Sequence, residues 1–211
     1  MTEDAGLPGP AAGTLVVIDM QRVFGEPGSA WRAPRFSEVV GPIRALAGAF
    51  APRVTFTRFV APERPEGSWR EYYRQWPFAL QPPDAPIYDL VPEFADHSGR
   101  TVDATTFSKW GPELAARLGG APMVLAGVST DCCVLSTALA AADAGVDVRV
   151  VADACAGVDD ESHAKALDIM ALYGPLVRVI GLDQALALAA GEARTAQEPG
   201  AARDSGTGQE R

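Results

Sequence analysis

Hydrophobic residues along the chain alternate between short continuous runs and stretches with a helical spacing. Residues 14–18 and 54–59 form apolar runs typical of strands covered on both faces, and residues 36–50 between them have a helical period. Further strands are expected at 122–126, 146–151 and 176–180, and further helices at 112–118, 131–144, 159–173 and 182–190. This alternation predicts an α/β fold of three layers, α/β/α, with a mostly parallel, Rossmann-like central sheet.

Three segments depart from this alternation. Residues 1–13 and 191–211 are rich in small and polar residues and lack an apolar period, so we expect a flexible leader and a disordered tail around one domain, 14–190. Residues 61–103 combine many prolines with many aromatic residues, and the segment is too long for an idle connection. It could cover a substrate, contact another subunit, or form a surface excursion packed by its own aromatic side chains.

Composition and charge limit the classes of partner that the chain can bind. The chain of 211 residues is 47% hydrophobic and 21% charged, which is ordinary for a globular domain with a sizeable core. Its net charge of -9 disfavours a nucleic-acid partner, because phosphate binding needs a basic surface. No apolar run approaches the roughly 20 residues that cross a bilayer, and the start lacks the basic region of a secretory signal. We therefore expect no membrane partner.

Cysteine and histidine usage points to a reducing compartment and to no metal. The three cysteines are Cys132, Cys133 and Cys155; an adjacent pair and an odd count make a poor disulfide framework, which favours a cytoplasmic location. The chain has no Cys-x-x-Cys pattern, and only His97 and His163 could supply imidazole ligands. We expect neither a metal nor another cofactor.

Candidate chemistry follows several predicted strands at their carboxyl ends, where ligands bind in parallel α/β sheets. Asp19 comes directly after the first strand, and Cys132 and Cys133 follow the strand 122–126, at the start of the next helix. Lys109 lies in a loop after Thr101–Val102, between Phe107 and Trp110.

Each of these residues has a catalytic and a structural interpretation. A thiol at a helix N-terminus ionises more easily, and the backbone N–H groups there can hold an oxyanion, but such a cysteine can also be a small core residue. Asp19 could move protons or simply complete a turn. Lys109 could be a solvated surface residue, or a buried ammonium that needs a carboxylate or thiolate partner.

Taken together, four segments resemble the isochorismatase-like cysteine hydrolase superfamily, which includes nicotinamidases, N-carbamoylsarcosine amidohydrolases, ureidoacrylate-type amidohydrolases and isochorismatase. They occur in the family's order, and the similarity covers roughly residues 14–187. The matching segments are 15–21, 107–109, 127–134 with Thr137–Ala138, and 150–156.

The resemblance implies a role for each candidate residue. Asp19 resembles the general acid/base and Lys109 the residue that supports the thiolate. The family's nucleophile precedes a valine, which selects Cys133 over Cys132. The family also has a cis peptide at the position of Val128–Ser129, and the N–H groups of Ser129 and Cys133 would hold the oxyanion.

The chain also departs from particular relatives. Nicotinamidases carry an Asp and two His near the second strand for a metal, whereas residues 57–63 here contain no His. Isochorismatase itself lacks the nucleophilic cysteine. We therefore expect a hydrolase that cleaves the C–N bond of a small amide through a thioester. The alternatives are a lactam, imide or ester hydrolase, an isochorismatase-type reaction, or an inactive binding relative. A nucleotide-binding Rossmann protein is disfavoured, because no Gly-rich turn follows the first strand.

The substrate pocket and the assembly are less defined by the sequence. Aromatic residues that could line the pocket, or simply pack together, are Phe24, Trp31, Trp69, Phe107 and Trp110. Arg58, Arg64 and Arg70 could hold a substrate carboxylate or remain solvated. The family resemblance implies a homo-oligomer, either a dimer or a tetramer.

Overall fold

The central feature of the computed structural model, which describes residues 13–197, is one parallel β-sheet. Within that range, six strands pair in the order β3-β2-β1-β4-β5-β6, and each neighbouring pair is parallel. The strands are β1 (Thr14–Ile18), β2 (Val54–Phe59), β3 (Thr101–Ala104), β4 (Met123–Val128), β5 (Val148–Ala156) and β6 (Val177–Ile180). The strand order reverses between β1 and β4, and such a switch point is where this class of sheet binds ligands.

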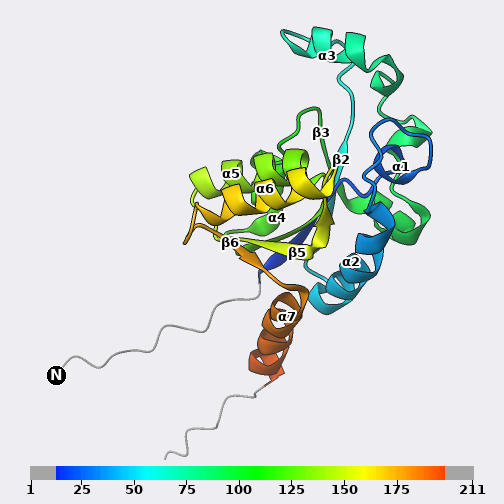
Figure 1. Ribbon diagram of the computed structural model, residues 1–211. Helices are drawn as coiled ribbons and strands as arrows, with labels where there is room; N and C mark the ends of the chain where they lie inside the picture. Colours follow the sequence, from blue (N-terminus) through cyan, green and yellow to red (C-terminus); the bar gives the residue numbers. More distant parts are fainter. Residues whose placement is uncertain (1–12, 198–211) are drawn as a thin grey trace, which may run out of the picture.

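Helices cover both faces of this sheet (Figure 1). On one face lie α2 (Phe36–Phe50), α7 (Leu182–Gln197) and the 3-10 segment η3 (Pro92–Arg100). On the other face lie α4 (Pro112–Leu118), α5 (Leu135–Asp143) and α6 (Asp160–Ala171). The predicted three-layer α/β/α fold is therefore confirmed.

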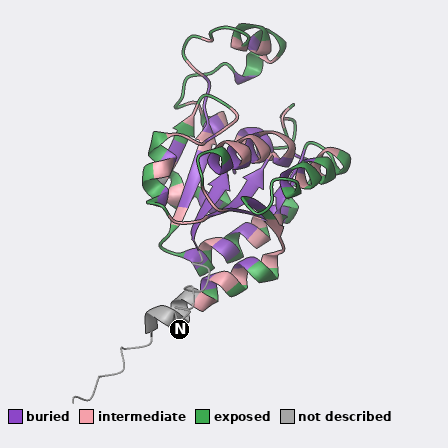
Figure 2. Cartoon of the chain, turned by 90° about the vertical axis from the view of Figure 1, so that its left-hand side faces the viewer, coloured by how far each residue is buried: buried purple, intermediate pink, exposed green. Residues whose placement is uncertain are grey.

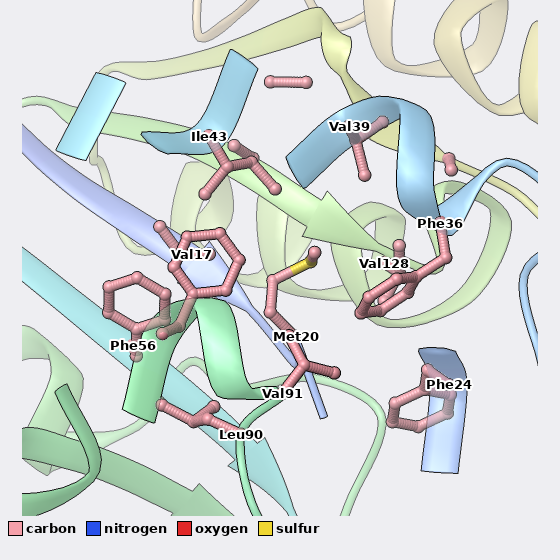
Figure 3. Close-up of a cluster of buried hydrophobic side chains, with 14 of the residues drawn as sticks. Val17, Met20, Phe24, Phe36, Val39, Ile43, Phe56, Leu90, Val91 and Val128 are labelled. Atoms are coloured by element: carbon pink, nitrogen blue, oxygen red, sulfur yellow. The ribbon is translucent and has the colours of Figure 1, made fainter. Parts of the chain in front are cut away.

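Alternate residues of β1 supply the two hydrophobic cores. Leu15 and Val17 belong to the cluster under α2 and α7, whereas Val16 and Ile18 belong to the cluster under α4, α5 and α6. All five residues of β1 are buried, as the continuous apolar run predicts for a strand covered on both faces. Figure 2 shows the strands as a buried layer between partly exposed helices. In Figure 3, Ile43 of α2 lies over Val17.

Several elements begin and end where the sequence predicts them, and others extend further. The bounds of β1, α2, β2 and α4 agree with the expected ranges. Strand β5 continues to Ala156, and α7 continues to Gln197, so the disorder expected from residue 191 is wrong for residues 191–197. Those residues are rich in Glu, Ala, Arg and Gln, which extend a helix readily. The rest of the expected leader and tail, 1–12 and 198–211, lies outside the described residues.

The proline- and aromatic-rich segment 61–103 forms short helical elements that local periodicity does not reveal. They are α3 (Trp69–Gln75), η1 (Pro77–Ala79), η2 (Pro86–Tyr88) and η3. Three of these begin with proline, which suits the first helical turn but allows only short helices here. The part of the segment around α3 rises beyond the carboxyl end of β2 (Figures 1 and 2). Tyr73, Ala79 and Tyr88 are buried, so the segment is packed.

Across the described part of the chain, no helix has both the length and the apolar character needed to cross a membrane.

Candidate active site

The turn after β1 holds Asp19 in an unusual backbone conformation. Asp19 has a φ of 50°, in the left-handed region that non-glycine residues rarely adopt. The N–H of Gln21 donates to the Asp19 carbonyl at 2.7 Å, which closes the turn. The buried Gln21 side chain then donates to the carbonyls of Phe59 and Tyr88 at 2.9 and 2.8 Å and accepts from the Phe59 N–H at 2.8 Å. These bonds fix the backbone that carries Asp19.

A buried ion pair joins Asp19 to Lys109. Lys109 Nζ lies 3.0 Å from Asp19 Oδ2, and both side chains are completely buried. The ammonium also donates to the Thr106 carbonyl at 3.0 Å and lies 4.9 Å from the centre of the Phe59 ring. Thr57 donates its hydroxyl to Asp19 Oδ1 at 2.7 Å. Apart from the ion pair, Asp19 Oδ2 has no hydrogen-bond donor among the described residues, so it can still accept a proton.

The candidate nucleophile lies in a π-helical turn, η4 (Thr130–Val134), between β4 and α5. The sequence predicts an ordinary helix from residue 131, and the wider turn is a correction to that expectation. The Ser129 carbonyl accepts from the N–H groups of Cys132 and Val134, both at 3.1 Å, and this shared acceptor closes the wide turn. The peptide bond between Val128 and Ser129 is cis, as the family resemblance implies.

Gly127 allows the switch point to close tightly. Its φ is 116°, and a Cβ at this position would lie 2.1 Å from the Ile18 carbonyl oxygen. Only glycine therefore fits between the ends of β1 and β4 without moving one of the strands. This close approach sets the turn of Asp19 beside the turn that carries the thiols.

Thr137 connects the nucleophile turn to the lysine loop. Its hydroxyl accepts from the Lys109 N–H at 2.9 Å and donates to the Cys133 carbonyl at 2.6 Å. The turn is also held from outside, since Thr130 Oγ1 lies 2.8 Å from His163 Nδ1 on α6. The structure thus brings Asp19, Lys109 and Cys133 to one edge of the sheet.

The sequence does not single out the residues that hold the site's groups in place, because each is a common polar residue in an apolar context. For Thr57, the one indication in the sequence is a polar residue inside an expected strand. In the structure it is fully buried beside the Asp19 carboxylate. Thr137 lies within the matching family segment, but its pattern gives no indication of the two backbone groups it joins. The contacts of Gln21 span elements far apart in sequence, so no local pattern predicts them.

The pKa values of the two thiols are shifted in opposite directions, so the easier ionisation expected at the helix start is not found at Cys133. A hydrogen bond between the side chains of Cys132 and Cys133 raises the pKa of Cys133, and burial raises it further, while the Lys109 ammonium lowers it less. The same hydrogen bond lowers the pKa of Cys132. Burial raises the pKa of Cys155 to about 12. These shifts favour the protonated form of Cys133, so a nearby base would assist its ionisation.

A cavity of about 240 Å³ opens onto the two thiols. Most of its wall is aromatic. Two of the rings, Tyr72 of α3 and Trp76 just after it, come from the segment 61–103. The lining residues are Phe24, Ala30, Trp31, Ala33, Phe59, Tyr72, Trp76, Phe107, Ser129, Asp131, Cys132, Cys133 and Val158. The segment 61–103 therefore contributes Tyr72 and Trp76 to the cavity wall, and its aromatic rings also pack against one another, so both of these expected interpretations stay open.

The structure corrects the predicted aromatic lining. Phe24, Trp31 and Phe107 line the cavity as expected, but Trp69 and Trp110 do not. The ring of Trp69 lies behind the wall, 4.9 Å from that of Phe107 between centroids. Trp110 packs against the core on the α4 and α5 side of the sheet. Neither position could be distinguished from a lining position by residue type.

The three candidate arginines also lie outside the cavity wall. Arg58 pairs with Asp103 on the neighbouring strand, with Nε 2.9 Å from Oδ1. Arg64 and Arg70 are exposed. Their predicted alternative, surface charge, is the one that the structure supports.

Another cavity, about 490 Å³ in volume, lies between the starts of α2 and α6, and its lining includes neither Cys132 nor Cys133. Its charged residues have partners, since Arg35 lies 2.6 Å from Asp160 and Asp153 accepts from the Leu182 N–H at 2.7 Å. The thiol that it contains is Cys155, whose high pKa disfavours reaction. We therefore place the chemistry in the smaller cavity.

The donor set of the described residues does not fit a metal. No group of three or more His, Cys, Asp and Glu side chains between residues 13 and 197 could hold an ion. At the end of β2 and directly after it, where such ligands could lie, the residues are Phe59, Val60 and Ala61. We therefore assign no catalytic step to a metal.

Residues 14–183 match the isochorismatase domain. Isochorismatase domain-containing protein 2 from Xenopus laevis is 38% identical over 88 residues, which is 40% of this chain and 43% of that protein. The protein of the same name from Rattus norvegicus is 36% identical over 81 residues, 36% of this chain and 38% of that protein. The matched region thus spans about two fifths of the length of these curated relatives.

Solved structures share the fold over most of the chain. A cysteine hydrolase from Pseudomonas syringae pv. phaseolicola has a TM-score of 0.74 at 20% identity, covering 84% of this chain and 92% of that one. The pyrazinamidase of Pyrococcus horikoshii in complex with zinc has a TM-score of 0.64 at 25% identity, covering 80% and 98%. Yeast nicotinamidase bound to nicotinaldehyde has a TM-score of 0.65 at 20% identity, covering 80% and 99%.

Proposed function

Because the chain belongs to the isochorismatase family and is a hydrolase, we propose that it is a cysteine amidohydrolase. In this proposal it cleaves the C–N bond of a small amide through a thioester on Cys133. The observation that carries the proposal is the buried Asp19–Lys109 pair, with a free carboxylate lone pair, at the sheet edge where Cys133 lines an aromatic cavity.

The first step is proton transfer from Cys133 to Asp19. The raised pKa of Cys133 favours the thiol, so a base assists the attack, and apart from its ion pair with Lys109 the Asp19 Oδ2 atom accepts no hydrogen bond. The Lys109 ammonium stabilises the thiolate as it forms. The sulfur then attacks the amide carbonyl carbon: a C–S bond forms, and the carbonyl π electrons move to oxygen.

Later steps use the same groups in reverse. The backbone N–H groups of Ser129 and Cys133 hold the oxyanion, in the manner of other acyl-transfer sites. The C–N bond breaks as the leaving nitrogen takes the proton from Asp19, which leaves a thioester. Asp19 then takes a proton from water, the hydroxide displaces the acyl group, and the sulfur recovers its proton.

Two features favour Cys133 over its neighbour as the nucleophile. Thr137 ties the carbonyl of Cys133 to the backbone of Lys109, so the lysine and the nucleophile share one support. Cys133 is also followed by Val134, as in the family. Cys132 is less buried than Cys133 and lies beside it in the cavity wall, which suits a supporting role.

The decisive experiment measures ammonia release from a panel of small primary amides. Cys133→Ala should remove turnover while leaving the circular dichroism spectrum and the unfolding midpoint near those of the wild type. The matched control is Cys155→Ala, because Cys155 lies outside the cavity and should be dispensable for turnover. Acid-quenched wild-type enzyme should carry an acyl group on the peptide that contains Cys133. Wild-type turnover by Cys133→Ala would eliminate the proposed nucleophile.

A further inference from the structure

The wall of the small cavity is built from aromatic rings in mutual contact. The Trp31 ring is the centre of this group: it stacks on Phe24 at 6.0 Å and meets the edges of Phe59 and Trp76 at 5.8 and 6.2 Å. Tyr72 contacts both Trp31 and Phe107, at 5.8 and 5.6 Å. Because each ring is held by others, the apolar wall is formed before any substrate binds.

The cavity is also small. Its volume of about 240 Å³ lies below the roughly 300–1,000 Å³ typical of sites for drug-sized ligands. A bound molecule of this size would have its acyl group in contact with several ring faces at once. Burial against those faces, rather than a long set of polar contacts, therefore supplies the binding free energy.

No cation lines this cavity among the described residues. The Lys109 ammonium is behind the wall, where Asp19 and the Thr106 carbonyl already satisfy it. Arg58 is held by Asp103 and is not part of the lining.

The ionised side chain that does line the cavity is acidic. Asp131 accepts through Oδ1 from the Ser129 hydroxyl at 2.9 Å and from the Val158 N–H at 2.8 Å. Its negative charge faces the same space as the two thiols. A carboxylate on the substrate would lose its water without gaining a cation, and it would also be repelled by Asp131.

We infer that the site takes amides whose acyl group is uncharged and apolar, and that it excludes acyl groups bearing a carboxylate. This inference rests on the proposed function, because it concerns the part of the substrate that becomes attached to Cys133. The aromatic wall recognises the acyl chain by burial, and the lack of a lining cation rejects anions.

Aldehydes test this inference without requiring the correct leaving group. A thiol adds to an aldehyde so that a C–S bond forms, the C=O double bond becomes C–O, and the proton moves to oxygen. Isocaproaldehyde and succinic semialdehyde have similar chain lengths and differ by an isopropyl group against a carboxylate. Isothermal titration calorimetry should show tighter binding of isocaproaldehyde, on the order of 100-fold or more. This binding should disappear in Cys133→Ala.

A second pair tests whether the site prefers a cation. Betaine aldehyde and tert-butylacetaldehyde have nearly the same shape, but the first carries a permanent positive charge. The uncharged aldehyde should bind more tightly. Tighter binding of betaine aldehyde would overturn the inference in favour of a cationic acyl group held by the ring faces and Asp131.

A gain-of-function variant provides a direct control. Trp76→Arg introduces a guanidinium into the wall, and Trp76→Gln removes the same ring without adding charge. For each variant, the affinity for succinic semialdehyde is divided by the affinity for isocaproaldehyde. This ratio should be about tenfold higher in Trp76→Arg than in Trp76→Gln.

The possible results separate this inference from the proposed function. Equal or tighter binding of succinic semialdehyde by the wild type, still dependent on Cys133, would overturn the inference and leave the nucleophile in place. If none of the aldehydes binds in a Cys133-dependent manner, the proposed function fails, and this inference fails with it.

Discussion

The ammonium of Lys109 and the carboxylate of Asp19 lie 3.0 Å apart with no exposed surface on either side chain. Each charge would be costly to bury alone, so the free energy of folding and the chemistry of the site depend on the same contact. The two residues are far apart in sequence, and the sheet brings them together because each follows a parallel strand, β1 for Asp19 and β3 for Lys109.

Removing one member of this pair should destabilise the protein. Lys109→Met leaves the Asp19 carboxylate buried without its counter-charge, and we expect a loss of about 3–5 kcal/mol in the free energy of unfolding. The double variant Asp19→Asn with Lys109→Met should recover part of this loss. Urea denaturation measures both. As a control, Arg74→Gln breaks an exposed pair with Glu71 and should change stability by less than about 1 kcal/mol. Equal stability of Lys109→Met and the wild type would contradict the buried pair.

Thr137→Val should affect both stability and turnover. The substitution keeps the shape of the side chain but removes the hydroxyl that joins the Lys109 N–H to the Cys133 carbonyl. Leaving the buried Lys109 N–H without its acceptor should cost about 1–3 kcal/mol. We expect kcat to fall more than KM rises, because the bond positions reacting groups. Thr137→Ser keeps the hydroxyl and should restore most of kcat; failure of this rescue would argue against a positioning role.

Cys132→Ala should shift the pH dependence of the reaction toward lower pH. The hydrogen bond with Cys132 raises the pKa of Cys133, so its removal lowers that pKa and extends thiolate formation to more acidic solutions. The rate of Cys133 alkylation by iodoacetamide as a function of pH, followed by peptide mass spectrometry, measures this directly. Cys155, with a pKa of about 12, serves as the slow internal reference. A shift toward higher pH would contradict the assigned direction.

Gly127→Ala should be strongly destabilising. The new methyl group would lie 2.1 Å from the Ile18 carbonyl oxygen, and the positive φ adds strain. The matched control is Gly48→Ala, since Gly48 is an exposed residue within α2 and has open space around it. There the same substitution should stabilise the protein by up to about 1 kcal/mol, through helix propensity. Thermal unfolding of the two variants should therefore move in opposite directions, and a neutral Gly127→Ala would show that the strands can separate.

The sequence predicts the elements of the sheet well because burial imposes a pattern on them. The continuous apolar run of β1 and the helical period of α2 lead to the observed bounds. The candidate residues Asp19, Lys109 and Cys133 could be selected because parallel strands gather their carboxyl ends at one edge. The family resemblance then selected Cys133 over Cys132, which position along the chain could not.

Features that depend on distant contacts could not be predicted. Trp69 and Tyr72 share one turn of α3, yet only Tyr72 faces the cavity. The ionisation of Cys133 depends on the Cys132 side chain and on burial, and a helix-start argument does not include either. The roles of Thr57 and Thr137 depend on which backbone or carboxylate atoms approach them across the sheet.

The contacts of Gln21 have a consequence for the shape of the cavity. The chain leaves β2 after Phe59 and passes the turn after β1 again at Tyr88, and the Gln21 side chain is hydrogen-bonded to both points. The intervening stretch, which carries Tyr72 and Trp76, therefore has both of its ends fixed to the turn that holds Asp19. Substitutions of Tyr72 or Trp76 should therefore change which molecules fit the cavity while Asp19 and Lys109 stay in place.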